Sequence, residues 1–426
     1  MKRDDLDEFV TLYNPANRQR QKWLSYHANT MIYTPSTLLP LPDTPFGHNL
    51  RRFWSLDPAV HFLNHGSYGA TPRFVQAEQS RWRDELEREP VRFMSDILPD
   101  ALRVAGARLA AFVGASASNL AFVENATAGA NAVLRSIRWN AGDRIVIANH
   151  AYPALKNTVR FLAERHGLLI IEAQIPWPLS SPEELVAAYV DALKGGARVA
   201  ILDHIFSPLA VVTPIEPIVR VCRERGVQVL IDGAHAPGLL PLSLATLGDK
   251  GVDWYVGNCH KWLCAPKGCG FIVATPGGQR DLHPAVISNF FGQGFEKEFA
   301  WTGTADPGAR LAVTAALDFI EALGVERYRD ALRNQANAAA AFLQNAWRVS
   351  PGAPVEMFAG MVTLPLAVDE PGSDEAVARW RLKLLREHNI EVPIHSIGGR
   401  LWVRISAQVY NEMSDYEALA RVFAAP

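Results

Sequence analysis

The chain has 426 residues, of which 49% are hydrophobic, 20% charged and 9% aromatic. This ordinary globular composition argues against long disordered tracts, collagen and coiled coil. Its 42 Lys and Arg against 44 Asp and Glu leave a formal charge of −2. Nucleic acids and anionic membrane surfaces select a basic excess, so we expect neither as a partner. No apolar run approaches the roughly 18–20 residues that cross a bilayer, and the acidic amino terminus lacks the apolar centre of a secretory signal. We therefore expect a cytoplasmic location.

The length predicts two or three domains, at roughly 100–200 residues per domain. Residues 1–54 are expected to form an amino-terminal arm that packs on the body or on a partner subunit. The stretch around Asn14–Arg20 could be helical, whereas a proline cluster after it predicts an extended connector. The prolines of this cluster are Pro35, Pro40, Pro42 and Pro45.

Residues 55–305 are expected to form a large domain, because short apolar runs alternate with helical patterns there. Strands are predicted at residues 144–148, 168–172, 198–203, 227–232 and 252–256, and helices at 155–166, 183–194 and 215–225. Short buried strands that alternate with helices indicate a mainly parallel sheet wrapped by helices. Ligands bind such sheets at the carboxyl ends of the strands, so polar residues at those positions are candidate site residues.

Residues 306–426 are expected to form a smaller carboxy-terminal α+β domain, with longer helices and fewer strands. Helices are predicted at residues 309–323, 326–346 and 374–388, and strands at 361–366 and 401–405. Ser414 is predicted to cap a last helix, with Glu417 at the capping-box position.

The chain has four cysteines, which are Cys222, Cys259, Cys264 and Cys269. The last three follow one another at five-residue intervals, whereas zinc ribbons use a two-residue gap between their cysteines. The histidines near the predicted strand ends lack a carboxylate-rich spacing as well. We therefore expect no metal site, and we expect the cysteines to be small buried or half-buried hydrophobic residues without a redox role.

Chemically active groups fall where a parallel sheet would present them. Asp232 ends one predicted strand, Lys261 follows the next, and a helix begins at Ala126 and Thr127. These groups suit pyridoxal 5′-phosphate, because a lysine forms an imine with its aldehyde, a carboxylate keeps its ring nitrogen protonated and a helix start holds its phosphate. Taken singly, Asp232 is also typical of a turn, Lys261 of a solvated surface and Thr127 of a plain N-cap.

Five segments together resemble the class V aminotransferase family of fold-type I pyridoxal phosphate enzymes, and most of all its isopenicillin N epimerase branch. The segments are Phe62–Gly69, Glu124–Asn131, Asp232–Gly238, Asn258–Trp262 and Trp301–Pro307. The resemblance covers roughly residues 55–426. It implies an α/β fold with a mainly parallel seven-stranded sheet in the large domain, next to the smaller carboxy-terminal domain.

The resemblance also implies a role for each matching residue. Lys261 would be the Schiff-base lysine and the proton shuttle at the substrate's Cα. Asp232 would pair with the pyridine nitrogen, while His235 and Ser207 would lie near the phenolic oxygen of the ring. Ala126, Thr127 and His260 would hold the phosphate, and Asn258 stands where many relatives carry Ser or Thr.

The remaining implied roles concern the substrate and a second subunit. Arg404 matches the arginine that clamps the substrate carboxylate, a task suited to a bidentate guanidinium. Thr304 resembles the threonine that reaches the phosphate of the neighbouring subunit, which implies a homodimer with shared active sites. The segment near the large domain's start would contribute further substrate-binding residues, namely Asn64, His65, Gly66 and Ser67.

The expected reaction is epimerisation of an amino acid or an amino-acid-containing small molecule through a Lys261 aldimine. Epimerisation requires proton exchange on both faces of the Cα carbanion. Lys261 would serve one face, and His150 or Tyr152, one of which stacks on the opposite face of the ring, would serve the other. The sequence does not choose between these two.

Other reactions of the family stay open. A C–S lyase and an aminotransferase start from the same Cα carbanion, and a binding protein without turnover is the alternative outside enzymes. Persulfide transfer is not expected, because desulfurases of that type carry a cysteine shortly before the carboxylate-binding arginine. Here Glu391–Gly399 has no cysteine, and none follows Cys269.

Overall fold

The computed structural model describes residues 39–40 and 43–423. The helix predicted around residues 14–20, together with Pro35 and Pro42 of the proline cluster, lies outside the described residues. Within the described part of the chain, no helix combines the length and apolar character needed to cross a membrane.

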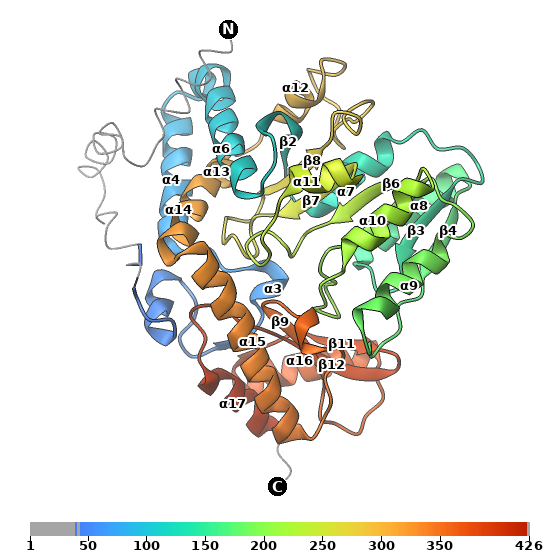
Figure 1. The fold of residues 1–426 in the computed structure, drawn as a ribbon. Coiled ribbons are helices and arrows are strands. Elements are labelled where there is room, and N and C mark those ends of the chain that lie inside the picture. The colour runs from blue at the N-terminus through green and yellow to red at the C-terminus, as the bar shows by residue number, and fades with distance from the viewer. Residues whose placement is uncertain (1–38, 41–42, 424–426) are drawn as a thin grey trace.

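A seven-stranded sheet forms the centre of the large domain (Figure 1). Its strands are β2 (Leu120–Val123), β3 (Arg144–Ala148), β4 (Leu169–Ala173), β5 (Val199–Asp203), β6 (Gln228–Asp232), β7 (Trp254–Asn258) and β8 (Gly270–Ala274). They lie in the order β2-β8-β7-β6-β5-β3-β4. Strands β3 to β7 are parallel, whereas β8 runs antiparallel to both β7 and β2. The predicted mainly parallel sheet is therefore confirmed.

Helices cover this sheet with their apolar sides. They include α7 (Ala126–Ser136), α8 (Pro153–His166), α9 (Pro182–Ala192), α10 (Ile215–Glu224) and α11 (Leu244–Lys250). In α10 the buried residues Ile215, Ile218, Val219 and Cys222 recur at the spacing of one helix face. All four cysteines are buried and free of disulfide bonds, as the sequence predicts.

The smaller domain lies below the large sheet in Figure 1, with α15 (Val325–Trp347) running along it. Its antiparallel sheet has the order β11-β12-β9, with β9 (Met361–Pro365), β11 (Ile394–Ile397) and β12 (Arg400–Ser406). Helices α16 (Asp374–His388) and α17 (Met413–Val422) complete it. The predicted cap of the last helix is wrong, because Glu412 is the N-cap and Asp415 its capping-box partner, which leaves Ser414 inside the first turn.

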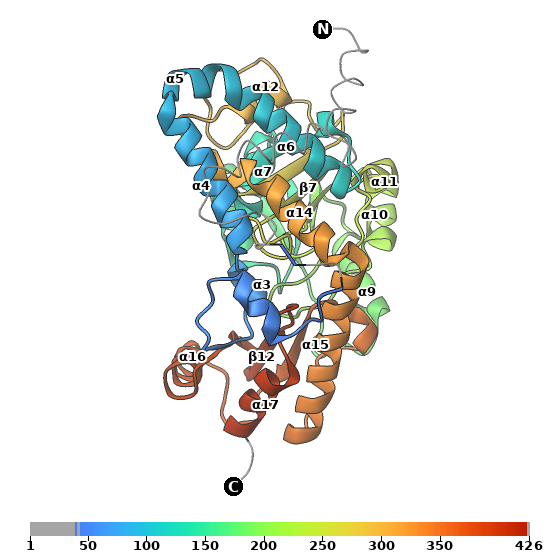
Figure 2. The same cartoon turned by 90° about the vertical axis from the view of Figure 1, so that its left-hand side faces the viewer.

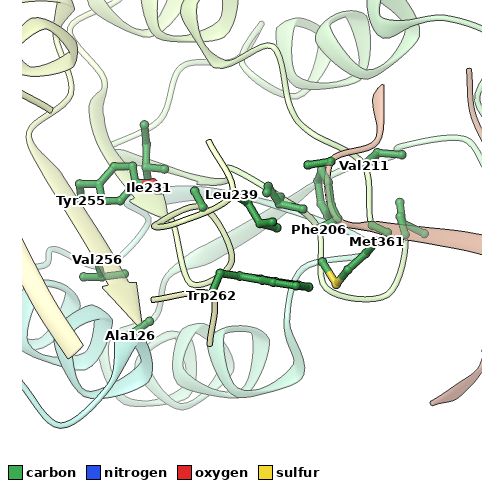
Figure 3. Close-up of a cluster of buried hydrophobic side chains, with 14 of the residues drawn as sticks. Ala126, Phe206, Val211, Ile231, Leu239, Tyr255, Val256, Trp262 and Met361 are labelled. Carbon is green, nitrogen blue, oxygen red and sulfur yellow. The ribbon is translucent and has the colours of Figure 1, made fainter. Parts of the chain in front are cut away.

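The segment before the large sheet packs against the carboxy-terminal domain. Strand β1 (His61–Phe62) pairs with β10 (Ile390–Glu391), and Figure 2 shows α3 (His65–Tyr68) close to β12. Figure 3 shows how the two domains meet around Trp262, a fully buried side chain that extends from the loop after β7 towards Met361 of β9. This contact fixes the chain immediately after Lys261.

Candidate active site

A cavity of about 440 Å³ lies at the carboxyl ends of β5, β6 and β7, where an open parallel sheet binds its ligands. The predicted residues that line it are Ser67, Ala126, Thr127, Tyr152, Ser207, Asp232, His235, Asn258, His260 and Lys261. They come from several segments of the chain, between Ser67 and Lys261. The sheet topology brings them together, since the strand ends share one edge.

Lys261 is buried next to His235, with its Nζ 3.0 Å from His235 Nε2. The other ring nitrogen of His235 accepts a hydrogen bond from Trp262 Nε1 at 3.4 Å. That places the ring proton on Nε2, so the lysine amine accepts it and is uncharged in this arrangement. Burial, and then repulsion from Arg404, lowers the pKa of Lys261 to about 7, while Asp232 acts in the opposite direction. The amine is therefore available as a nucleophile and a base near neutral pH.

His65, which was predicted to bind substrate, does not line the cavity. Its imidazole is fully buried on the other side of the lysine peptide. Nε2 lies 3.0 Å from the Lys261 carbonyl and Nδ1 lies 2.8 Å from the Tyr410 hydroxyl. Burial lowers the pKa of His65 to about 3, which keeps the ring neutral. The Tyr328 hydroxyl donates in the same way to the Trp262 carbonyl at 3.0 Å. These side chains hold the backbone that carries Lys261.

Asp232 ends β6 beneath the cavity and is 5% exposed. Its Oδ1 accepts a hydrogen bond from the Ala234 N–H at 3.0 Å. Burial raises the pKa of Asp232, and the Ala234 N–H opposes that rise, as does Lys261 when it is protonated. A bound cation would favour the ionised carboxylate further, as a protonated pyridine nitrogen does.

The start of α7 presents free donors to the cavity. Asn125 is its N-cap and accepts from the Ala128 N–H at 2.9 Å, so Thr127 is not the cap. The Ala126 N–H donates to Asn258 Oδ1 at 2.8 Å. In the described chain, no hydrogen bond is recorded for the Thr127 N–H. His260 Nδ1 is buried without a partner among the described residues. These groups surround a position suited to an anion at a helix start.

Arg404 on β12 lies directly behind the cavity wall and is 2% exposed. Its Nη1 donates to the Ser207 carbonyl at 2.7 Å and to Ser207 Oγ at 3.1 Å, and its Nη2 donates to Ser67 Oγ at 3.0 Å. Its Nε is buried without a partner. Burial lowers the pKa of Arg404 to about 10. No described carboxylate forms an ion pair with it, so a substrate carboxylate would supply the missing counter-charge.

Two more residues of the predicted substrate-binding segment lie outside the cavity wall. Asn64 donates through Nδ2 to Glu391 Oε1 at 3.0 Å and is 9% exposed. The Gly66 N–H donates to Ser406 Oγ at 3.2 Å. A Cβ at Gly66 would approach Met361 Sδ to 2.5 Å, so this position needs the space for packing. Of the segment, only Ser67 reaches the cavity.

Of the two candidates for stacking on the cofactor ring, Tyr152 alone lines the cavity. It precedes α8 and its side chain is 42% exposed. His150 is half-buried and hydrogen-bonds towards the backbone of Ile175, and burial lowers its pKa. Thr304 is exposed and does not line the cavity of its own chain.

Known proteins are similar to this chain in sequence and in fold. The family model described as Aminotransferase class-V matches residues 81–419. The L-cysteine desulfhydrase of Arabidopsis thaliana is 31% identical over 411 residues, which cover 88% of this chain and 88% of that protein. The chain belongs to the class V aminotransferase family. Isopenicillin N epimerase of Amycolatopsis lactamdurans is 33% identical over 394 residues, covering 87% of this class V chain and 96% of the epimerase.

A solved structure shares the fold of this class V aminotransferase. The apo cysteine desulfurase from Thermococcus onnurineus NA1 superposes with a TM-score of 0.74 at 18% identity, and the match covers 90% of this chain and 98% of that one. The family is one of pyridoxal phosphate enzymes, and this chain is one of them.

The residues present fit pyridoxal 5′-phosphate. The unpartnered His260 Nδ1 and the Thr127 N–H suit its phosphate, the Asp232 carboxylate its ring nitrogen, and the Lys261 amine its aldehyde. The described residues contain no group of three or more His, Cys, Asp or Glu side chains that is placed to hold a metal ion.

Sequence reasoning missed Asp203, which ends β5 and lines the cavity of this class V enzyme beside Asp232. The signal was the same one that identified Asp232, namely a carboxylate at the carboxyl end of a buried parallel strand. It also missed Tyr328 and Gln408, which are fully buried behind Lys261 and joined by a 2.8 Å hydrogen bond. Their distance in the chain from Lys261 left no local signal.

Proposed function

We propose that this enzyme removes the Cα proton of cysteine or a small S-substituted cysteine and expels the sulfur, as a C–S lyase. The observation that carries the proposal is the buried Lys261 amine, whose pKa is lowered to about 7, beside a buried guanidinium, Arg404, that has no counter-ion among the described residues. β-Elimination needs one base, because the thiolate leaves by itself once the Cα proton is gone. The similarity to L-cysteine desulfhydrases supports this chemistry.

Each residue of the site has a separate role in the proposed reaction. Arg404 and the Ser67 and Ser207 hydroxyls orient the substrate carboxylate, which aims the Cα–H bond at the Lys261 amine. Lys261 takes the proton and can return it, and Asp232 keeps a proton on the cofactor's ring nitrogen. Pyridoxal phosphate supplies the electron sink for the pair left at Cα. The products from cysteine are hydrogen sulfide and 2-aminoacrylate, which water converts to pyruvate and ammonia.

Persulfide formation on the enzyme does not fit the cavity. Its wall, formed by described residues, contains no cysteine, and Cys264 is buried against His65 on the far side of the lysine peptide. Sulfur therefore leaves as a free thiol or sulfide in the proposed reaction.

Epimerisation at Cα is the second candidate, and the position of Tyr152 favours it. Tyr152 lines the cavity and is 42% exposed, so its hydroxyl is a candidate for a proton donor on the face opposite Lys261. The similarity to isopenicillin N epimerases supports this alternative. Epimerisation needs proton exchange on both faces of the Cα carbanion. His150, the other residue considered for this role, does not line the cavity.

Incubation of the purified holoenzyme with L-cysteine, S-methylcysteine and other amino acids in deuterated water separates these reactions. We expect sulfide and pyruvate in equal amounts from cysteine, and loss of both in Lys261→Ala. Deuterium at Cα with inversion and no sulfide would replace the lyase proposal by epimerisation. A keto acid without sulfide would indicate transamination, and cofactor binding without any product would refute catalysis on this panel.

We also propose a homodimer with shared sites. Thr304 is exposed and lies outside its own cavity wall, so its hydroxyl is available to a second copy. The exposed apolar residues Val286, Ile287 and Phe291 suit burial against that copy. Mixing Lys261→Ala with Thr304→Ala chains tests sharing. Heterodimers would contain one intact site and regain activity if Thr304 acts across the interface, and would stay inactive if it acts within its own chain. Native activity of Thr304→Ala alone would show that Thr304 has no role.

A further inference from the structure

A second carboxyl group lies beside Asp232. Asp203 and Asp232 are direct register partners at the carboxyl ends of the parallel strands β5 and β6. Neighbouring strands lie roughly 4.7–4.9 Å apart, and paired positions of a parallel sheet present their side chains to the same face. Both carboxyls line the cavity, and they are 2% and 5% exposed. The two carboxyl groups therefore lie next to each other and are both shielded from solvent.

The groups around Asp203 do not compensate a second negative charge. Asp232 faces it from β6, Tyr189 faces it from α9, and the Tyr152 backbone N–H is its hydrogen-bonding neighbour on the cavity side. No described lysine, arginine or histidine forms an ion pair with it, and its Oδ2 is buried without a partner. Adjacent carboxylates removed from water do not both ionise. Burial, and then Asp232, raises the pKa of Asp203 well above its ordinary value.

The environment also decides which of the two keeps the proton. The Ala234 N–H donates to Asp232 Oδ1 at 3.0 Å, and the protonated ring nitrogen of a bound cofactor would favour an ionised Asp232 further. Asp203 lacks a comparable cation. We propose that Asp203 holds a proton and acts as a positioning residue, donating it in a hydrogen bond to the Asp232 carboxylate, so that the pair presents one negative charge to the cofactor's ring nitrogen. This role is the same for elimination and epimerisation.

Two substitutions distinguish a neutral donor from a charged group. Asp203→Asn keeps the shape and an N–H donor without charge, whereas Asp203→Ala removes the donor. Titration of each apoprotein with pyridoxal phosphate, followed by visible absorbance, is expected to give native affinity for Asp203→Asn and about 3- to 10-fold weaker binding for Asp203→Ala. Equal losses in both variants would show that the charge matters, and native affinity in Asp203→Ala would show no positioning role. Either result overturns the proposal.

Thermal unfolding of the apoproteins gives a readout independent of cofactor and turnover. An acid whose folded pKa lies above the unfolded value of about 3.9 must take up a proton on folding at higher pH. The native protein should therefore lose stability relative to Asp203→Asn as pH rises from about 4 to 7. Asp191→Asn, which removes an exposed carboxylate of α9, is the control and should show no such trend. A pH-independent difference for Asp203→Asn would refute the protonated state.

Discussion

The two edges of the seven-stranded sheet differ in how they treat polar groups. At the amino ends of β3, β5 and β6 a solvent-open hollow of about 570 Å³ is lined by glycines and by Arg144, Arg198 and Gln228. Its polar groups bond to the backbone or are open to solvent. For example, Arg144 Nε donates to the Gly196 carbonyl at 3.0 Å. At the carboxyl ends the cavity is smaller, about 440 Å³, yet Asp203 Oδ2 and His260 Nδ1 are buried there without partners.

The buried polar groups without partners, and not the volume of the hollow, identify the site. A buried polar group without a hydrogen bond costs roughly 1–3 kcal/mol, so a fold that keeps several of them at one edge gives up stability there. A phosphate, a pyridine nitrogen and a carboxylate would satisfy those groups. The arginines of the amino edge have no such need, because Arg198 is exposed to solvent and the half-buried Arg144 donates to the Gly196 carbonyl. The comparison predicts that substitutions at the carboxyl edge affect catalysis and that others do not.

The largest effect is expected for Lys261→Ala. The variant loses one of the two lysine amines of the cavity wall. The other, Lys267, donates through Nζ to the Gly69 carbonyl at 3.2 Å. Turnover should fall by at least about 10³-fold, since both covalent attachment and proton transfer are lost. Product formation and the visible absorbance of the bound cofactor measure it. Lys250→Ala, an exposed change on α11, is the control. More than a tenth of native turnover in Lys261→Ala would contradict the site.

Arg404→Ala should have the next largest effect. Loss of the buried guanidinium removes the counter-charge for the substrate carboxylate. The ratio kcat/KM should therefore fall by a factor that corresponds to about 2–5 kcal/mol, mainly through a higher KM. Arg400→Ala is a matched control, because Arg400 is exposed on the same strand. Steady-state kinetics on an amino acid substrate measure both. An unchanged KM in Arg404→Ala would mean that the carboxylate binds elsewhere.

The sequence was sufficient to predict the parallel sheet and the residues at its carboxyl edge. Short apolar runs mark the strands. Asp232 at the end of β6 and Lys261 shortly after β7 must lie close together, because parallel strands end on one side. Asp203 follows the same rule, since it ends β5.

Other features depend on packing between distant segments. His65 belongs to a segment typical of the family's site, but its imidazole turns to Tyr410, which is 345 residues away. Thr127 and Ser414 were plausible caps, yet the backbone enters α7 and α17 at Asn125 and Glu412. Which polar residue caps a helix depends on the direction from which the chain arrives, and that direction is set by tertiary contacts.

Asp415→Asn should affect stability without affecting turnover. Burial would raise the pKa of Asp415, but hydrogen bonds from His61, His48 and the Glu412 N–H together lower it. A depressed folded pKa adds stability above the unfolded value of about 3.9, and this is lost as pH falls through the folded pKa. We expect the variant to be about 1–3 kcal/mol less stable at pH 7, with a smaller difference below about pH 4. Denaturant unfolding at both pH values checks this, and a fall in kcat would contradict it.

The smallest effect is expected for Arg198→Ala at the amino edge. Arg198 is exposed in the open hollow, so its loss should change stability by no more than about 0.5 kcal/mol and leave kcat/KM unchanged. Unfolding and steady-state kinetics test the two parts separately. A lower stability alone would mean that the guanidinium packs against its neighbours. A lower kcat/KM would mean that the amino edge communicates with the cavity. The contrast between edges would then be one of degree, because a solvated group at one end of the strands would be influencing chemistry at the other.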